Sequence, residues 1–530
     1  MAIDRVLSPD ASQSALGARA LWRALQGAWS WAAARRAALA TGVGLWAGIT
    51  ALLLLVQFGS PALVGVDGYY HLRMAQLMRA EGWLPEFRWL PMTILSPAGY
   101  YDHHFLYHLL MVPFAWGDPA AGGAARLALG GKVASVAIAS LAFLTFWAGL
   151  RRRVRWAAIW TLGLFAVSEA FLYRMSMPRA QAASLLLLLT AFFLLAERRF
   201  IFLAPLGFAY VWLYDAFPLL LLFAACSLAA DLALERRFDA RPLLYSGVGI
   251  GLGLLINPYF PRNLVFIVQH LVPKLGQPGI PVGNEWYPYD TWTLMTNSGP
   301  AFVALGAGLF FLGKRGGRLD RATLMALLLA AVFGLLFLKA RRFAEYSPPF
   351  SLLLLALTAS PWLEQFAKRR RDLRRRLALS VAAVLVLPLG WTTWHARQAV
   401  AASAPLERYG QAATWLASHS RPGDLVFQTD WDDFPRLFFY NTTNAYILGL
   451  DPTYLQLADE DLYDEWVAIT RGRIERPSAS IGPRFGARFV FTDLLHEAFL
   501  VQAEADPGLR EIYRDRTVVI FAVLPRGERQ

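Results

Sequence analysis

The stretch Val66-Asp67-Gly68-Tyr69-Tyr70-His71-Leu72-Arg73 directly follows the first long apolar run, where a membrane span gives way to water. Aromatic residues gather at the boundary between lipid and water, but an acidic residue there is unexpected. The pattern predicts that Asp67 is the acidic centre of an active site on the outer face of a membrane. An alternative role is a helix N-cap, because Asp is a favoured residue at that position. His71 follows four residues later and therefore shares a helical face with Asp67.

Composition indicates an integral membrane protein. Of the 530 residues, 56% are hydrophobic and 17% are charged, whereas about a quarter of a soluble protein is charged. Repeated apolar runs of roughly 17–25 residues are long enough to cross a bilayer. The net charge of +13 comes from clusters between these runs, which is typical of cytoplasmic loops, so we expect no nucleic-acid partner. The lone Cys226 excludes a disulfide framework and a thiolate metal site.

Charge and hydropathy predict a polytopic α-helical protein with about eleven transmembrane helices. Residues 1–40 have the pattern of a basic amphipathic helix on the cytoplasmic leaflet. Residues 41–394 form the expected transmembrane domain, with a long first outer loop at 60–126 and another outer loop at 257–292. Because most basic clusters then fall on the cytoplasmic side, residues 395–530 are predicted to be extracytoplasmic.

This C-terminal segment has the pattern of an α/β domain. Asp424–Phe427, Arg488–Phe491 and Thr517–Phe521 have the composition of short buried strands, and Tyr409–Ser418 has helical spacing. Strands that alternate with helical segments predict a small α/β domain on the outer face.

A cluster of cations breaks the charge pattern. Lys339, Arg341 and Arg342 lie on the outer side by this count, where short loops normally lack such clusters. Guanidinium groups present several donors to a phosphate in a fixed geometry, so anion binding is one reason to keep them there. Pairing with Glu345, or extension towards lipid headgroups, is the alternative.

Two other outer segments carry charge. Arg174 and Arg179 flank the turn after the third expected span, where an ion pair with Glu169 is their alternative role. Glu285 stands among aromatic residues in the loop at 257–292. A carboxylate there could act as a base or hydrogen-bond acceptor, or could belong to an ordinary interfacial loop.

A second acidic and histidine-rich group is Asp102-His103-His104, followed by His108. His104 and His108 are four residues apart, a spacing that suits a metal ion if a third ligand is near. Asp102 or Asp67 could supply that ligand. The other readings are an active-site role for Asp102 with one histidine, and an interfacial helix whose histidines bond lipid or backbone.

Taken together, these segments resemble the catalytic subunit of oligosaccharyltransferases and the wider GT-C-type membrane glycosyltransferases. Asp67–Arg73 is similar to the family's first outer-loop acidic motif, whose aspartate helps to bind a metal and activates the acceptor. Arg341–Tyr346 is similar to the segment whose arginine contacts the lipid-linked pyrophosphate. Glu285 matches, by position, the glutamate of the family's mobile fifth outer loop. Asp430–Phe434 lies where the family carries its acceptor-peptide motif.

Two departures from the family pattern are informative. Where the second outer loop should carry an acidic pair, this chain has Arg174-Met175-Ser176-Met177-Pro178-Arg179, so the metal site is incomplete unless Asp102 or His103 compensates. The acceptor motif would be Trp-Trp-Asp-Tyr-Gly, but this chain has Asp430-Trp431-Asp432-Asp433-Phe434. That difference favours an acceptor other than an Asn sequon, and a reaction without a metal stays open.

The resemblance implies an enzyme that transfers a sugar or glycan from a polyprenyl-(pyro)phosphate carrier to a protein, glycan or lipid acceptor. It would act among membrane lipids on the outer face of a bacterial or archaeal cytoplasmic membrane. The alternatives are a monophosphate-carrier transferase that acts on lipid or protein hydroxyls, a transporter or flippase for a lipid-linked saccharide, and a non-catalytic assembly factor. The expected site residues are Asp67, Asp102 and Glu285 for catalysis; Arg341, Arg342, Lys339 and Arg179 for the lipid phosphate; Trp431, Asp432, Asp433, His71 and Tyr70 for the acceptor; and Asp67, Asp102 and His103 for a divalent ion, Mg or Mn.

Overall fold

The computed structural model describes residues 39–275, 280–317, 319–369 and 374–525. The chain divides into two compact units, residues 1–51 and 52–530. The basic cytoplasmic segment predicted at residues 1–40 falls almost wholly outside the described residues.

The fold is mostly helical, as predicted, and a helix occupies each segment expected to span the membrane. These helices are Leu39–Gln57, α4 (Ala124–Leu150), α5 (Ala157–Leu162), α7 (Gln181–Ala196), α8 (Leu203–Leu213), α9 (Leu219–Glu235), α10 (Arg241–Leu255), α12 (Thr291–Lys314), α13 (Arg321–Lys339), α14 (Ser347–Arg369) and α15 (Arg374–Ala401).

Within the described part of the chain, four helices are long and apolar enough to cross a membrane: Leu39–Gln57, α4, α12 and α13. A crossing needs about 20 apolar residues, and α7 has only 16. The third expected span is a short helix, α5, that continues as the 3₁₀ turn η3 (Gly163–Phe165). The number of eleven crossings therefore stays a prediction.

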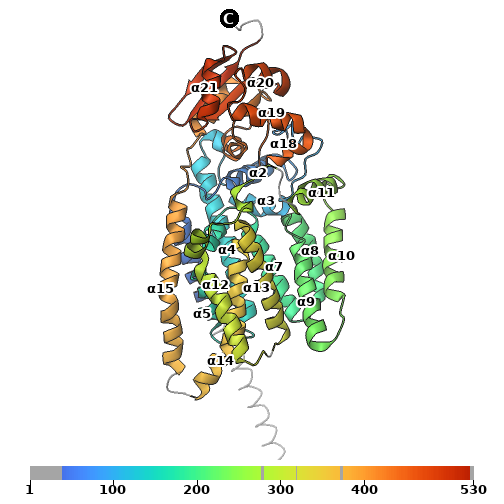
Figure 1. Cartoon of the computed structure of the whole chain (residues 1–530), viewed down its shortest axis with the longest axis vertical. Coiled ribbons are helices and arrows are strands. Elements are labelled where there is room, and N and C mark those ends of the chain that lie inside the picture. Colours follow the sequence, from blue (N-terminus) through green and yellow to red (C-terminus); the bar gives the residue numbers. More distant parts are fainter. Residues whose placement is uncertain (1–38, 276–279, 318, 370–373, 526–530) are drawn as a thin grey trace, which may run out of the picture. The chain divides into compact units, whose positions relative to one another are not determined.

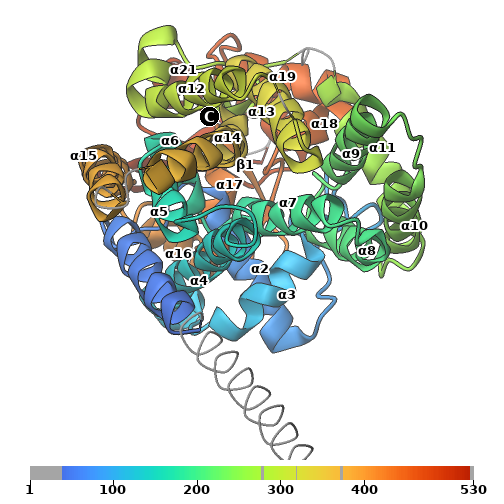
Figure 2. The same ribbon diagram turned by 90° about the horizontal axis from the view of Figure 1, so that it is seen from below.

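Close helix packing depends on small residues. Figure 2 shows α8, α9 and α10 beside one another, with α12, α13 and α14 as a second group. A Cβ atom at Gly249 of α10 would lie 2.0 Å from the carbonyl oxygen of Ala204 in α8. Only glycine fits at that point, and small residues commonly bring membrane helices into such contact.

A buried lysine fixes the start of the segment that follows the first apolar helix. The ammonium group of Lys132, in α4, donates to the carbonyl oxygens of Gln57 and Ser60 at 2.8 Å. Carbonyls at a helix C-terminus carry partial negative charge and lack partners within the helix, so a cation is favourable there. This contact holds the chain that leads to Asp67 against α4.

Short helices connect the long helices, and several of them lie between the long helices and the C-terminal sheet (Figure 1). They are α2 (Asp67–Glu81), α3 (Phe105–Met111) with η1 (Val112–Phe114), η2 (Pro119–Ala121), α6 (Glu169–Met175), α11 (Arg262–Leu275), η5 (Asn284–Trp286) and η6 (Arg341–Glu345). A Cβ at Gly68 would lie 2.2 Å from Cγ of Pro178. Glycine therefore lets the first turn of α2 approach the turn after α6 closely, which brings Asp67 towards Arg179.

The C-terminal domain contains a five-stranded mixed sheet in the order β2-β1-β3-β5-β4, with β1 parallel to β2 and β3, and β5 antiparallel to β3 and β4. The strands are β1 (Leu425–Gln428), β2 (Ala445–Tyr446), β3 (Phe489–Asp493), β4 (Leu509–Arg514) and β5 (Val518–Val523). The helices are α16 (Gly410–His419), η8 (Trp431–Asp433), α17 (Phe434–Tyr440), α18 (Thr453–Ala458), α19 (Glu460–Thr470), α20 (Ser478–Phe485) and α21 (Glu497–Ala505).

The predicted helix and strands of this domain correspond to α16, β1, β3 and β5. β2 and β4 were not predicted from the sequence. β2 has only two residues. β4 carries the exposed, charged residues Arg510, Glu511 and Arg514, so it lacks the continuous apolar run that predicts a buried strand. The domain core includes Phe427 of β1 and Val490 of β3.

Candidate active site

A cavity of about 740 Å³ lies where the short connecting helices meet the C-terminal domain. Segments from nine parts of the chain line it, and most of them contribute charged or hydrogen-bonding side chains. The polar lining includes Asp67, Tyr70, His71, His103, His104, Arg174, Arg179, Tyr214, Asp215, His270, Glu285, Arg341, Arg342, Asp430, Asp432 and Asp451. Asp67 and the two arginines of η6 therefore face one cavity, although about 275 positions separate them in the sequence.

Asp67 is the first residue of α2, and the N-cap position belongs to Val66. Instead of capping the helix, the Asp67 carboxylate forms an ion pair with Arg179, with 3.0 Å between Oδ2 and Nη2. Burial raises the pKa of Asp67, and Arg179 opposes that rise. The Asp67 carboxylate is therefore partly shielded from water and is paired with the guanidinium of Arg179.

Glu285, in η5, joins several guanidinium groups. Its Oε2 lies 3.0 Å from Nη2 of Arg174 and 3.0 Å from Nη1 of Arg179, and its Oε1 lies 4.0 Å from Arg342. Arg174 also donates from Nε to Glu345 at 2.6 Å. We call these five residues together with Asp67 and Arg341 the arginine cluster.

The electrostatics of the arginine cluster favour the ionised forms of Glu285 and Arg179, whereas burial raises the pKa of Asp67 and Glu345. Burial disfavours ionisation of Glu285, but Arg179, Arg342 and Arg174 outweigh it and hold the pKa of Glu285 well below its usual range. Burial lowers the pKa of Arg179, yet Asp67 and Glu285 more than compensate and raise it well above its ordinary value. Buried charges that lack partners would be far more costly than these pairs.

Arg341 and Arg342 are positioned by aromatic residues. The Arg342 guanidinium lies 4.0 Å from the ring centroid of Trp286 and donates to the Tyr214 hydroxyl at 2.8 Å. Arg341 lies over the ring of Tyr289. Stacking on an aromatic face leaves the edge of a guanidinium available for hydrogen bonds. Lys339 is exposed at the end of α13 and does not line the cavity.

These contacts differ from the alternative pairings considered for the cations. Glu345 pairs with Arg174 in the structure, whereas neither arginine of η6 forms an ion pair with it among the described residues. The ion-pair partners of Arg174 and Arg179 are Glu345, Glu285 and Asp67, rather than Glu169.

A buried hydrogen-bonded series, which we call the histidine chain, runs from Asp102 to the cavity. Asp102 Oδ2 lies 2.7 Å from Nδ1 of His108, and His108 Nε2 lies 2.8 Å from Nδ1 of His71. Asp102 and His108 do not line the cavity, whereas His71 does. Burial and the neighbouring His108 and Arg179 hold the pKa of His71 well below its usual range. His71 is therefore neutral at neutral pH.

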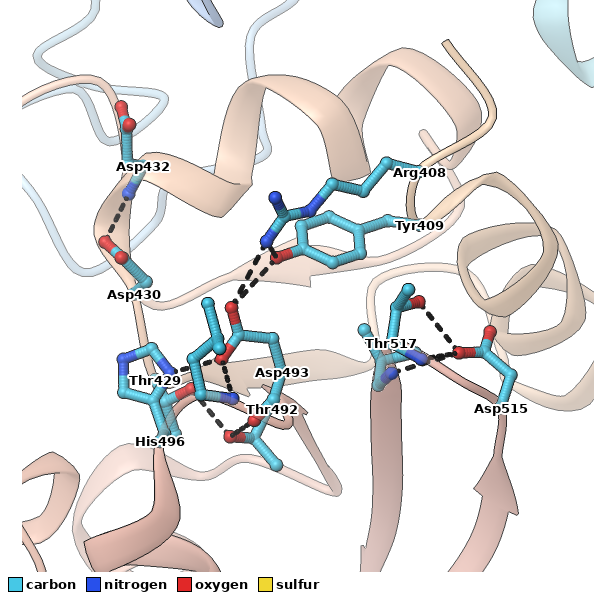
Figure 3. A network of polar contacts seen from close by, with 12 residues as sticks. Arg408, Tyr409, Thr429, Asp430, Asp432, Thr492, Asp493, His496, Asp515 and Thr517 are labelled. Carbon is cyan, nitrogen blue, oxygen red and sulfur yellow. Dashed lines mark hydrogen bonds and ion pairs between the residues drawn. The ribbon is translucent and has the colours of Figure 1, made fainter. Parts of the chain in front are cut away.

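The carboxyl end of β1 supplies another wall. Thr429 hydrogen-bonds to Phe491 and Thr492 of β3, and the next residues turn through η8. Figure 3 shows Asp430 and Asp432 on this turn, where Asp430 accepts from the Asp432 amide at 3.0 Å. In open sheets with parallel strands, loops at the carboxyl ends of the strands commonly build ligand sites.

The turn is held from behind by a second network, also drawn in Figure 3. Asp493 accepts from the Tyr409 hydroxyl at 3.2 Å and pairs with His496 at 2.7 Å. Asp433 is buried and does not line the cavity, and burial raises its pKa well above the usual range. Asp432 does line the cavity, and burial and nearby carboxylates raise its pKa to about 7.

The residues expected to hold a divalent ion do not form a common ligand set. Asp102 uses one oxygen to accept from the backbone of His104 and the other to contact His108. Asp67 faces a guanidinium. In the residues that the structure describes, no group of three or more His, Cys, Asp or Glu side chains is arranged to hold a metal ion. The donor set around Asp67, Asp102 and His103 therefore does not fit the implied metal.

Several lining residues were missed by the sequence analysis. Tyr214 and the ion pair between Asp215 and His270, whose atoms are 2.7 Å apart, come from a short turn and from α11. Asp215 follows the apolar helix α8, and His270 lies among apolar residues inside α11. An ionisable residue at such a place is a signal for a site.

No protein-family model matches the chain, and no curated protein does. Solved structures do. The Archaeoglobus fulgidus oligosaccharyltransferase AglB, in complex with an inhibitory peptide and a dolichol-phosphate, has a TM-score of 0.60 at 16% identity; the match covers 91% of this chain and 74% of AglB. An Archaeoglobus fulgidus oligosaccharyltransferase in complex with Zn and sulfate is also similar, with a TM-score of 0.57 at 15% identity; the match covers 91% of this chain and 74% of that chain.

Two other structures are similar over most of this chain. ArnT from Cupriavidus metallidurans, bound to undecaprenyl phosphate, gives a TM-score of 0.54 at 16% identity, with 91% of this chain and 97% of ArnT covered. The mycobacterial arabinofuranosyltransferase AftD has a TM-score of 0.51 at 17% sequence identity, and the match covers 91% of this chain and 41% of AftD. At these identities the similarity shows the fold.

Proposed function

We propose that this chain, which has the fold of the GT-C membrane glycosyltransferases, transfers a sugar from a polyprenyl-phosphate carrier to an acceptor. The observation that carries the proposal is the shared cavity, which Asp67 lines together with Arg341 and Arg342. The similar structures of AglB and ArnT were solved with dolichol-phosphate and undecaprenyl phosphate, which supports a lipid-phosphate donor here.

The arginines of η6 are proposed to bind the phosphate of the donor. When the bond between the anomeric carbon and the phosphate oxygen breaks, the bonding electrons leave with the carrier phosphate. Arg341 and Arg342 would stabilise that developing charge, and their stacking on aromatic rings fixes them before the reaction begins. Lys339 would contribute from the exposed rim, as a weaker and more screened charge.

The acceptor is proposed to lie between α2 and the turn after β1. Its nucleophilic atom forms a bond to the anomeric carbon and gives its proton to Asp67, the general base. Glu285 would assist by holding Arg179 and Arg342 in place. Asp102 would act through His108 on His71, which with Tyr70 orients the acceptor.

Residues of the C-terminal domain would complete acceptor binding. Trp431 and Asp432 line the cavity, and Asp433 would support the turn from behind. Because this turn departs from the peptide-reading motif of oligosaccharyltransferases, we propose a hydroxyl on a lipid or protein as the acceptor rather than an Asn sequon.

Charge favours a monophosphate carrier over a pyrophosphate. The arginine cluster contains four guanidiniums and three carboxylates, which leaves one positive charge when all are ionised. A sugar linked through one phosphate carries one negative charge, whereas a pyrophosphate linkage carries two. The nearly complete coverage of ArnT, at 97%, agrees with this class of carrier.

We place the protein in a bacterial or archaeal cytoplasmic membrane, with the C-terminal domain on the outer face. The four long apolar helices support a membrane location. The orientation depends on the basic clusters between apolar runs, as the positive-inside rule requires.

The proposal is tested with the purified full-length protein and two donors that share one sugar, on a polyprenyl monophosphate and on a polyprenyl pyrophosphate. We expect transfer to hydroxyl acceptors from the monophosphate donor. Transfer from the pyrophosphate donor alone would overturn the carrier assignment, and absence of transfer from both would overturn the proposed function.

A further inference from the structure

The guanidinium of Arg179 occupies the space beside Asp67, the residue at which the family resemblance places a metal ion. Its Nη2 lies 3.0 Å from Oδ2 of Asp67, and its Nη1 lies 3.0 Å from Oε2 of Glu285. With the Gln181 amide turned so that its oxygen faces the guanidinium, that oxygen accepts from Nε of Arg179 at 3.1 Å. Every nitrogen of the group therefore has an acceptor.

A divalent ion and this guanidinium cannot share the position. Both would require the same oxygens of Asp67 and Glu285, and two cations in contact repel each other strongly in a partly buried site. The turn from Arg174 to Arg179 contains no carboxylate that could complete an ion's ligand set. Asp102, the other carboxylate considered as a ligand, is turned away towards His108 and the backbone of His104.

We propose that Arg179 supplies the positive charge that a metal ion would supply between Asp67 and Glu285, so that the site works without a divalent cation. The inference rests on the proposed function, because it assigns this charge a role in the same transfer reaction. Arg179 is a positioning residue: it holds the carboxylate of Asp67 and ties the first outer loop to η5.

An arginine is suited to this task by its shape. The planar guanidinium presents donors to two carboxylates at once, and it keeps its charge over the whole physiological pH range. It brings one positive charge where a divalent ion brings two. The local balance is therefore less positive than in a metal site, which agrees with a donor that carries a single negative charge.

The experiment is a titration of the full-length protein in detergent with Mn²⁺, followed by the loss of the electron paramagnetic resonance signal of the free ion. We expect wild type and Asp67→Asn to bind equally little Mn²⁺. Arg179→Asp, which places a third carboxylate beside Asp67 and Glu285, should bind Mn²⁺ about tenfold more tightly or better. Arg341→Gln is the matched control, since Arg341 lines the same cavity without an ion pair to either carboxylate.

Two results would overturn the inference. One is a stoichiometric Mn²⁺ site in wild type that Asp67→Asn removes. The other is a folded Arg179→Asp protein that binds Mn²⁺ no better than wild type. If Arg179→Asp does not fold, the comparison of wild type with Asp67→Asn decides alone.

A chelator separates this inference from the proposed function. The transfer rate of wild type should be unchanged by EDTA, and a rate that EDTA abolishes and Mn²⁺ restores would contradict the role of Arg179. A protein without any transferase activity would overturn the proposed function, whereas the Mn²⁺ titration would still report on the cation position.

Discussion

The arginine cluster and the histidine chain meet the same cavity but are built on different physical principles. The cluster joins guanidinium and carboxyl groups from α2, from α6 and the turn after it, from η5 and from η6, and guanidiniums outnumber carboxyl groups by one. The histidine chain joins a buried carboxylate to two imidazoles through hydrogen bonds, and it ends on the neutral His71. A surplus of positive charge suits an anion, whereas a hydrogen-bonded chain can orient a group or pass on a proton. Under the proposed function, the arginine cluster would bind the donor and the histidine chain would orient the acceptor.

The largest effect is expected at Asp67, where the two regions meet. Asp67→Asn keeps the size of the side chain but removes the base, so the transfer rate should fall by ~10²–10⁴-fold. The protein should remain folded, because the amide can still accept from Arg179. Transfer rate and thermal unfolding are measured together. Glu81→Gln, at the exposed end of the same helix, is the control; full activity of Asp67→Asn would refute its role.

A smaller effect is expected from Asp102→Asn, which alters the histidine chain without touching the cavity. The rate constant kcat should fall by ~10-fold or more, with KM for the donor unchanged, because His108 loses the carboxylate that sets its tautomer.

The pH profile distinguishes this effect from simple loss of structure. Removal of a carboxylate disfavours a protonated imidazole nearby, so the acid limb of the profile should move to lower pH. In wild type that limb should already lie below 6.5, the ordinary pKa of histidine, because burial and neighbouring cations lower the pKa of His71. If the acid limb of the Asp102→Asn profile did not shift, or if KM for the donor changed, the proposed role of the histidine chain in acceptor binding would be contradicted.

The smallest effect concerns stability rather than transfer. The pKa of Asp432 is raised from 3.8 to about 7, so between these values the folded protein binds more protons than the unfolded chain. Stability therefore decreases as pH rises from about 4 to about 7 on account of this group. Asp432→Asn should leave Tm nearly unchanged at pH 4 and raise it at pH 8. Equal Tm differences at both pH values would contradict the burial of this carboxyl group.

Local motifs could be predicted from the sequence, but their partners could not. An aspartate directly after an apolar run is a signal contained in a few residues. So are two arginines in a short loop where the positive-inside rule expects none. The ion pairs of Arg174 with Glu285 and Glu345 join residues more than 100 positions apart, and no periodicity indicates such pairs. The sequence analysis therefore considered Glu169, the nearest acid along the chain.

The same limit explains the errors in secondary structure and metal ligation. Buried strands such as β3 have continuous apolar runs, whereas β2 pairs through only two residues and β4 is mostly polar. His104 and His108 have ligand spacing on one helix, but His108 turns to His71, which lies 37 positions earlier. Side-chain direction at such sites depends on tertiary packing.

The most direct test of the division between the two walls is a binding titration with polyprenyl monophosphate, carried out on wild type, Arg342→Gln and Asp67→Asn. Arg342→Gln should weaken binding by ~10-fold or more, because the half-buried guanidinium proposed to contact the phosphate is lost. Asp67→Asn should bind as tightly as wild type or more tightly, since it removes a negative charge from the cavity. Unchanged binding in Arg342→Gln, or loss of binding in Asp67→Asn, would contradict a cavity in which the arginines hold the donor and Asp67 serves the acceptor.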